Sequence, residues 1–283
     1  MNLEKTRVVN IIKAALKEDI GRGDITTNSI VSRLESVKGG IIANEECVVC
    51  GIDIAEWVLS SLDYSVRFKP QVQDGDVVHT GKEVAFVEGH ARAILTAERT
   101  ILNFLSFLSG VATETRKYVD RVKNYNVKIL DTRKTLPLLR YLQKYAVTVG
   151  GGYNHRMNLG EMAILKDNHR QVSGAGHQTE ALRERIQKNI KIELEVDTLE
   201  EFEQALKQKP DIIMLDNLDV ETVKKTVQVR EAYGLSREIL LEVSGGITLD
   251  NVEEYAAAGV DKISVGALTD SVRGIDFSLN FGR

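Results

Sequence analysis

The pattern of hydrophobic and polar positions divides the chain into two parts. Up to about residue 109, a few helical stripes are mixed with short strand-like runs that end at glycines. From residue 127 onward, short apolar runs alternate with charged segments of helical spacing. Such alternation is typical of parallel strands joined by right-handed helical crossovers. The pattern therefore predicts an α/β domain that follows an N-terminal domain of a different kind.

In the first part, apolar residues recur at helical spacing in three segments and in loose alternation in two. The segment 91–108 ends near Gly110, where we place the domain boundary because glycine punctuates helices. The helical segments are residues 3–16, 54–62 and 91–108, and the strand-like runs are residues 38–49 and 74–89.

The second part contains seven strand candidates, which fit a closed or nearly closed barrel. An open doubly wound sheet is the alternative, but neither G-x-G-x-x-G after an early strand nor a Walker A motif is present. We expect a domain over residues 1–109, a barrel over 110–270, and a tail, 271–283, that packs back on the first domain. The strand candidates are residues 127–130, 145–149, 163–165, 190–196, 212–215, 239–243 and 262–265, with helices over 199–208, 220–233 and 249–258.

Composition narrows the class of protein. Of the 283 residues, 43% are hydrophobic and 28% are charged, a balance that supports a packed core and argues against disorder. The net charge of −4 gives no global positive field for nucleic acid, so an anion site must be built locally. Charged residues interrupt residues 3–16 and 94–108, which excludes a secretory signal or membrane span there and leads us to expect a cytoplasmic protein.

Cys47 and Cys50 form a C-x-x-C pair, which occurs in redox sites and as half of a zinc site. A zinc site needs about four ligands, and the chain has no second cysteine pair. The surrounding run is apolar, so we interpret both cysteines as small hydrophobic residues of the core.

Polar clusters follow most of the predicted strands, and the carboxyl ends of parallel strands meet on one rim. Single charges at strand ends are usually solvated, but here several cations gather and would repel one another unless an anion binds among them. The rim therefore predicts a polyanion site. Its cations are Arg133, Lys134, His155, Arg156, Lys166 and His169.

The last two predicted strands end in small residues. Barrels often bind phosphate there through backbone N–H groups, and glycine lets phosphate oxygens approach closely. Two acids, Glu195 and Asp216, stand on the same rim, where they can serve a divalent metal and sugar hydroxyls or form structural salt bridges. The two candidate phosphate turns contain Ser244, Gly245 and Gly246, and Val265, Gly266 and Ala267.

A series of motifs in this order resembles quinolinate phosphoribosyltransferase, also called carboxylating nicotinate-nucleotide pyrophosphorylase. The series covers nearly the whole chain. It comprises Gly23-Asp-Ile-Thr-Thr27, Asp131-Thr-Arg-Lys-Thr-Leu-Pro137, Arg140, Lys144-Tyr-Ala-Val147, Gly150-Gly-Gly152, Asn154-His-Arg156, Lys166-Asp-Asn-His169, Glu195-Val-Asp197, Met214-Leu-Asp-Asn217 and Ser244-Gly-Gly246.

The resemblance implies an N-terminal α/β sandwich domain, a C-terminal incomplete TIM-like barrel, and a homodimer or larger assembly. It implies that quinolinate and phosphoribosyl pyrophosphate react with Mg²⁺ to give nicotinate mononucleotide, carbon dioxide and pyrophosphate. It also implies that Arg99 crosses to a neighbouring subunit's site. By the same resemblance, quinolinate and pyrophosphate are bound by Thr132, Arg133, Lys134, His155, Arg156 and Lys166, and the 5′-phosphate is bound by Ser244, Gly245, Gly246, Val265, Gly266 and Ala267. The implied catalytic residues are Lys134, Lys166, Glu195 and Asp216. Glu195 and Asp216 would also contact the ribose and the metal, directly or through water.

Three positions depart from the family pattern. Leu138 replaces a usual glycine and Val149 a common cysteine, which we interpret as packing changes, whereas Asp270 stands where some members carry histidine, near the phosphate contacts.

The alternative functions are those of a paralogous transferase that has lost the dicarboxylate site and of a non-catalytic phosphosugar-binding barrel. The retained cations argue against the first, and the acids Glu195 and Asp216 argue against the second.

Overall fold

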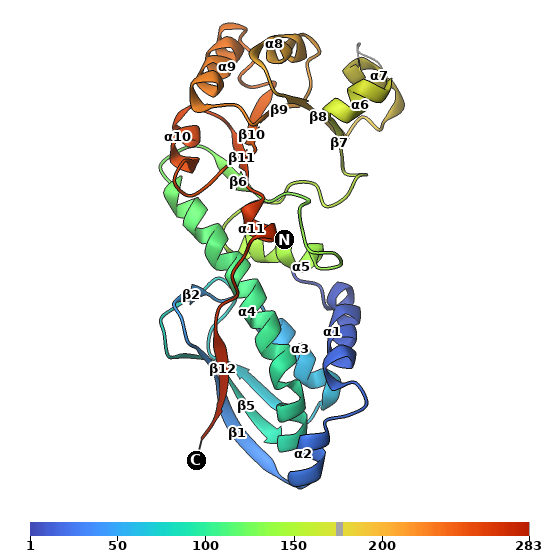
Figure 1. Ribbon diagram of the computed structural model, residues 1–283, viewed down its shortest axis with the longest axis vertical. Helices are drawn as coiled ribbons and strands as arrows, with labels where there is room; N and C mark the ends of the chain where they lie inside the picture. Colours follow the sequence, from blue (N-terminus) through green and yellow to red (C-terminus); the bar gives the residue numbers. More distant parts are fainter. Residues whose placement is uncertain (174–177, 283) are drawn as a thin grey trace. The chain divides into compact units, whose positions relative to one another are not determined.

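The computed structural model describes residues 1–173 and 178–282, which fall into two compact units (Figure 1). Unit 1 comprises residues 1–116, 136–151 and 271–283, of which residue 283 is outside the described part. Unit 2 comprises residues 117–135 and 152–270. The helix that begins at Ala91 continues across the expected boundary, and a short segment of the expected barrel belongs to unit 1.

Unit 1 is built on a four-stranded antiparallel sheet in the order β12-β1-β5-β3. The C-terminal strand pairs with the first strand, with Gly40 opposite Asn280. Part of the tail thus completes the sheet of unit 1. The strands are β1 (Ser36–Ala43), β3 (Arg67–Pro70), β5 (Lys82–His90) and β12 (Phe277–Phe281), with a separate pair, β2 (Cys47–Val48) and β4 (Val77–Val78).

Helices pack on this sheet and form the core of unit 1. Ile41 and Val87 from the sheet meet Leu59 and Ile94 from two helices around one small internal space. Cys47 and Cys50 are free and buried, which confirms their interpretation as core residues. The helices are α1 (Lys5–Ile20), α2 (Ile25–Ile30), α3 (Ile52–Leu62), α4 (Ala91–Arg121, shared with unit 2) and α5 (Arg140–Val149).

Two expectations about this region were wrong. Gly110 does not end a helix, because α4 runs through it to Arg121; a Cβ there would lie 3.0 Å from Val272 Cγ1, so glycine permits close packing of the tail. Residues 145–149 are the end of helix α5 and not a strand. The run is rich in β-branched residues, which favour strands, but it forms the last turns of a helix that is buried on most of its sides, including Leu142, Lys144 and Val147.

Unit 2 contains a six-stranded parallel sheet in the order β6-β11-β10-β9-β8-β7. Within the described residues, β6 and β7 are the edge strands and do not pair with each other, although Leu130 of β6 forms an isolated parallel bridge with Tyr153. The sheet is thus the expected barrel in incomplete form. The strands are β6 (Lys128–Leu130), β7 (Met162–Leu165), β8 (Lys191–Val196), β9 (Ile212–Asp216), β10 (Leu240–Ser244) and β11 (Lys262–Ser264).

Charged helices connect these strands, and the longer ones begin at side-chain caps. Thr198 accepts a hydrogen bond from the backbone of Glu201, and Asp219 accepts one from Thr222. Among the described residues, no helix has both the length and the apolar character to cross a membrane. The helices are α6 (Asp167–Ser173), α7 (Gln178–Arg185), α8 (Leu199–Lys207), α9 (Val220–Ala232), α10 (Val252–Ala257) and α11 (Ala267–Asp270).

Candidate active site

A pocket of about 570 Å³ lies at the carboxyl ends of the strands of unit 2. All six strands of the sheet, or the loops next to them, contribute to its lining. The sequence-predicted residues that line it are Thr132, Arg133, Lys134, His155, Arg156, Lys166, Glu195, Asp216, Ser244, Gly245, Gly246, Gly266 and Ala267.

Three predicted site residues, Arg99, Val265 and His169, do not line the pocket. Arg99 is exposed on α4 in unit 1, beside Arg273 and Glu45. Val265 is 1% exposed, and its backbone N–H donates to the carbonyl of Leu130 at 2.9 Å. Because that amide is used within the sheet, Val265 is not available to bind phosphate through its N–H.

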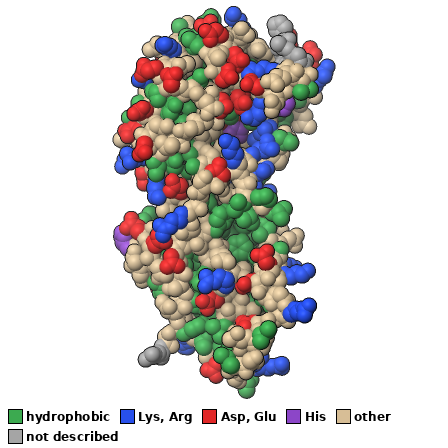
Figure 2. Space-filling view, in the orientation of Figure 1, with side chains coloured by type: hydrophobic (Ala, Val, Ile, Leu, Met, Phe, Trp, Pro, Cys, Tyr) green, Lys and Arg blue, Asp and Glu red, His purple; other side chains and the backbone are tan. Residues whose placement is uncertain are grey.

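One part of the pocket is lined by cations. Arg156 donates from Nη1 to the carbonyl of Met162 at 2.7 Å, which fixes the guanidinium. Burial lowers the pKa of Arg156, and the neighbouring Arg133 lowers it further. Two adjacent guanidiniums that repel each other in a half-buried site favour a bound anion. Figure 2 shows Lys and Arg side chains gathered near histidine on the visible face of unit 2.

Lys166 and Glu195 form an ion pair inside the pocket. Lys166 follows β7 and Glu195 belongs to the neighbouring β8, so the pairing of adjacent parallel strands brings them together. His169 does not line the pocket; its Nδ1 lies 3.1 Å from the backbone N of Lys166 and accepts its hydrogen bond.

Asp216, at the end of β9, is held by its neighbour Asn217. The Asn217 side-chain amide donates to Oδ2 of Asp216 at 3.0 Å, and its backbone N–H donates to the carbonyl of Ser244 at 2.9 Å. Asn217 has φ 54°, a left-handed conformation that asparagine tolerates. The last residue of β9 is thereby tied to the Ser244 turn.

The turn after β10 consists of Ser244, Gly245 and Gly246, with φ 90° and 64° at the two glycines. Positive φ at consecutive positions strongly favours glycine, and all three residues line the pocket. After β11, Gly266 lies close to Asp270, whose Oδ2 would be 3.1 Å from a Cβ on that glycine. Asp270 therefore lines the pocket beside the second turn.

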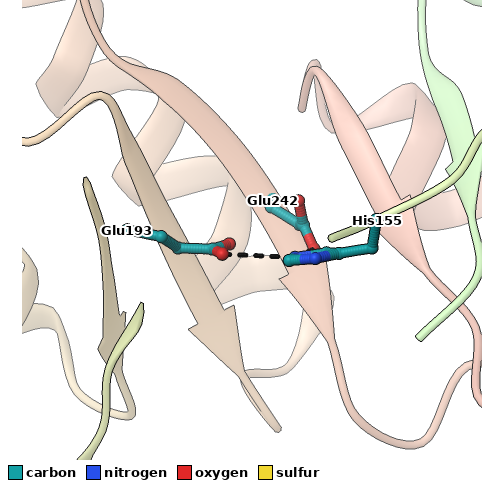
Figure 3. A group of neighbouring side chains, drawn as sticks. All are labelled: His155, Glu193 and Glu242. Carbon is teal, nitrogen blue, oxygen red and sulfur yellow. Dashed lines mark ion pairs between the residues drawn. The ribbon is translucent and has the colours of Figure 1, made fainter. Parts of the chain in front are cut away.

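Beneath the pocket, His155 meets two buried glutamates, Glu193 on β8 and Glu242 on β10 (Figure 3). Nε2 of His155 lies 3.2 Å from Glu193 Oε2 and 3.3 Å from Glu242 Oε1. Ser264 donates to Glu242 at 2.5 Å, and Lys262 Nζ lies 3.7 Å from the same carboxylate. Both glutamates are 0% exposed.

Burial raises the pKa of Glu193, and the nearby Glu242 raises it further. Burial also acts to raise the pKa of Glu242, but its contacts with His155 and Ser264 outweigh burial and lower it. Glu242 is therefore the member of the pair that holds the negative charge more firmly.

Comparison with known proteins identifies the family. The profile of the quinolinate phosphoribosyl transferase C-terminal domain matches residues 111–280, and that of the N-terminal domain matches residues 24–109. The chain belongs to this family. It is 44% identical to the probable nicotinate-nucleotide pyrophosphorylase (carboxylating) of Methanocaldococcus jannaschii, over 99% of both chains. It is 44% identical to the nicotinate-nucleotide pyrophosphorylase (carboxylating) of Mycobacterium leprae, over 95% of both chains.

Solved structures agree with this assignment to the quinolinate phosphoribosyl transferase family. The nicotinate-nucleotide pyrophosphorylase of Francisella tularensis superposes with a TM-score of 0.93 at 37% identity, over 99% of this chain and 98% of that one. The corresponding protein of Ehrlichia chaffeensis gives 0.92 at 39% identity over the full length of both chains. The fold expected from the sequence is thus confirmed.

A departure from the family pattern also has a structural explanation. Leu138, where the quinolinate phosphoribosyl transferase family usually has glycine, has φ 67° and is 89% exposed. An exposed side chain has little to pack against, so our interpretation of Leu138 as a packing change was wrong. The position demands a left-handed backbone, which glycine adopts without strain.

Sequence reasoning missed Glu193 and Glu242, although a signal for them exists. Glu242 is the one charged residue of β10, and Glu193 lies between the apolar residues Ile192 and Leu194 of β8. Each is two positions before a predicted site residue, Ser244 and Glu195 respectively. Because side chains alternate along a strand, residues two apart point to the same side of the sheet. A charge in that register belongs beneath the site, facing the same interior.

Proposed function

We propose that this pocket joins quinolinate to phosphoribosyl pyrophosphate and releases nicotinate mononucleotide, carbon dioxide and pyrophosphate. The observation that supports it best is the division of one pocket into a cationic part, two glycine turns and two carboxylates. Quinolinate carries two adjacent carboxylates, phosphoribosyl pyrophosphate carries a 5′-phosphate and a pyrophosphate, and its sugar becomes cationic as pyrophosphate leaves. The pocket offers a complement to each of these groups.

The quinolinate end is assigned to the cationic part of the pocket. Arg133 and Arg156 offer forked donors that match carboxylate geometry, and Lys134 adds a third positive charge. The anionic ligand relieves the repulsion between the two guanidiniums. When the 2-carboxylate leaves as carbon dioxide, these cations stabilise the negative charge that develops on the ring.

The phosphoribosyl end is assigned to the two glycine turns and the acids. Backbone N–H groups of residues 244–246 and 266–267 would bind the 5′-phosphate, with the geometry that positive φ gives to the first turn. Glu195 and Asp216 lie where their charges can stabilise the cationic sugar in the transition state. Lys166, paired with Glu195, holds that carboxylate in its place in the pocket.

The carboxylate oxygens of Glu195 and Asp216 fit the preference of Mg²⁺ for hard oxygen ligands. Of the two, Asp216 has a neutral partner, the amide of Asn217, whereas Glu195 has a cationic one. Asp216 would therefore hold the metal, directly or through water, and Glu195 would assist. Bound Mg²⁺ would neutralise charge on the departing pyrophosphate.

The proposal includes a homodimer or larger assembly in which Arg99 of one subunit reaches the site of another. Its support is the exposure of a long cationic side chain on α4, a helix that is otherwise largely buried. A cytoplasmic location stays a prediction that cell fractionation can test.

The proposed activity can be tested with the purified protein, quinolinate, phosphoribosyl pyrophosphate and Mg²⁺. We expect formation of nicotinate mononucleotide, measured by chromatography, and release of carbon dioxide from quinolinate labelled in the 2-carboxylate. Nicotinate, which lacks that carboxylate, should be a poor substrate. Equal turnover with nicotinate would contradict the assignment of the cationic part of the pocket to a dicarboxylate.

A further inference from the structure

The buried pair Glu193 and Glu242 has a definite relation to the pocket through His155. Both carboxylates approach the same ring nitrogen, Nε2, from strands that are separated by β9 (Figure 3). Among the described residues, neither oxygen of Glu193 has a hydrogen-bond partner, and nor does Nε2 of His155, so the contact between them is a close approach of two polar groups at 3.2 Å. A carboxylate buried in this way is costly, and the nearby groups that favour its ionised form are His155 and, at longer range, Lys262.

The other ring nitrogen of His155 is equally well defined. Nδ1 lies 2.7 Å from the backbone nitrogen of Arg156 and accepts its hydrogen bond. A nitrogen that accepts a hydrogen bond has a lone pair and no proton. Burial acts to lower the pKa of His155, but the two glutamates raise it to about 9 and favour a proton on Nε2, whereas the contact with Arg156 needs the lone pair of Nδ1 and opposes a second proton there. The same argument excludes a metal site formed by His155, Glu193 and Glu242. A metal bound to Nε2 would leave both ring nitrogens without a proton, because Nδ1 already has none.

The backbone around His155 is fixed as well. Its N–H donates to Oδ1 of buried Asp131 at 2.8 Å, and Asn154 donates to the other oxygen of Asp131 at 2.6 Å. Hydrogen bonds thus hold the loop on one side through Asp131 and on the other through the His155 ring. Arg156, at the end of this chain of contacts, lines the pocket next to Arg133.

We propose that Glu193 and Glu242 are positioning residues for the substrate carboxylates: they orient the His155 ring so that its Nδ1 holds the backbone of Arg156, and thereby place the Arg156 guanidinium. They do not contact the substrate. The negative charge of this pair, held chiefly on Glu242, lies beneath a pocket lined by several cations and offsets part of the repulsion between Arg133 and Arg156. This role rests on the proposed function for the identity of the anion.

The test uses Glu193→Gln and Glu242→Gln, which keep the side-chain shape and remove the carboxylate, in the full-length protein. An amide can present N–H toward Nε2, which favours rotation of the ring and loss of the Arg156 contact. Loss of one well-placed hydrogen bond to a charged group corresponds to roughly 10- to 100-fold in affinity. We expect weakening of that size for quinolinate, measured by calorimetry, with phosphoribosyl pyrophosphate binding nearly unchanged. Exposed Glu238→Gln removes one charge far from any site contact and should change neither.

A general loss of structure would weaken both substrates and lower Tm, so a selective loss of quinolinate affinity at normal Tm separates positioning from folding. Unchanged quinolinate affinity in folded variants would overturn the proposal. If the variants do not fold, the ¹⁵N NMR signals of the His155 ring in the wild-type protein decide it, because a proton on Nδ1 at neutral pH would be incompatible with the Arg156 contact. Absence of any nicotinate mononucleotide formation by the wild-type protein would instead contradict the proposed function.

Discussion

Asn217 occupies the space that a side chain at position 245 would need. A Cβ on Gly245 would lie 2.6 Å from Cγ and 3.0 Å from the backbone nitrogen of Asn217. The residue that orients Asp216 is thus the residue that restricts position 245 to glycine. One side chain couples the proposed metal ligand to the proposed phosphate turn.

This relationship makes Gly245→Ala a test of the phosphate turn. The methyl group must displace Asn217, and alanine is strained at φ 90°. We expect phosphoribosyl pyrophosphate binding to weaken roughly 10- to 100-fold, as for a lost charged hydrogen bond. Quinolinate binding, measured separately by calorimetry, should change little. The double variant Asn217→Gly, Gly245→Ala relieves the side-chain clash and should recover part of the affinity; equal weakening of both substrates would show that the turn has been assigned wrongly.

The acids are tested by Glu195→Gln and Asp216→Asn. If they stabilise the cationic sugar, kcat should fall about 100- to 1000-fold, because that stabilisation exists only in the transition state. Quinolinate affinity and Tm should stay near the wild-type values, since a partly exposed ion pair such as Lys166–Glu195 adds little stability. A folded double variant with full turnover would exclude a catalytic role for both acids.

Subunit sharing is tested by mixing Arg99→Ala with Lys134→Ala after dissociation and reassociation. Each variant alone should be inactive. If Arg99 acts in a neighbouring site, some hybrid sites contain both side chains, and activity should return in the mixture. Mixed dimers verified by mass spectrometry but still inactive would argue that each subunit uses its own Arg99.

Leu138→Gly should stabilise unit 1. A leucine in the left-handed region costs about 1–2 kcal/mol, which glycine would remove. Glycine also has a larger conformational entropy in the unfolded state, which opposes part of this effect, so we expect the free energy of unfolding to rise by about 0.5–1 kcal/mol. Urea unfolding measures it. Leu138→Ala shortens the same exposed side chain but keeps the backbone strain, and should give no comparable gain. If alanine stabilises as much as glycine, the effect does not come from φ.

The two cysteines should resist alkylation in the native protein. Burial, with the nearby charges of Glu45 and Glu46, raises the pKa of Cys47 to about 11. Burial likewise raises the pKa of Cys50. Only the thiolate reacts, and roughly a thousandth of a thiol with such a pKa is ionised at pH 8. Labelling by iodoacetamide, followed by mass spectrometry, should be slow at pH 8, faster as the pH rises, and rapid after unfolding. Rapid native labelling at pH 8 would contradict this burial.

The sequence by itself indicated the parallel α/β architecture of unit 2 and most of the residues that gather on its rim. Parallel strands bring their carboxyl ends to one edge, so Lys166, Glu195, Asp216 and Ser244 could be assigned to one site from their places after successive strands. The same logic identified the glycine turns, because glycine is needed wherever the backbone must bend sharply beside a ligand.

Tertiary structure decided the rest. Residues 145–149 have a strand-like composition but form a helix, since burial of the helix on most of its sides outweighs β propensity. The backbone N–H of Val265 is not available to bind phosphate, because β11 pairs with β6, a strand distant in the sequence, and this N–H donates to the carbonyl of Leu130. Glu193 and Glu242 meet at His155 although β9 separates their strands. Such convergence depends on the curvature of the sheet, which brings non-adjacent strands together across its interior, and curvature arises only when the whole sheet is assembled.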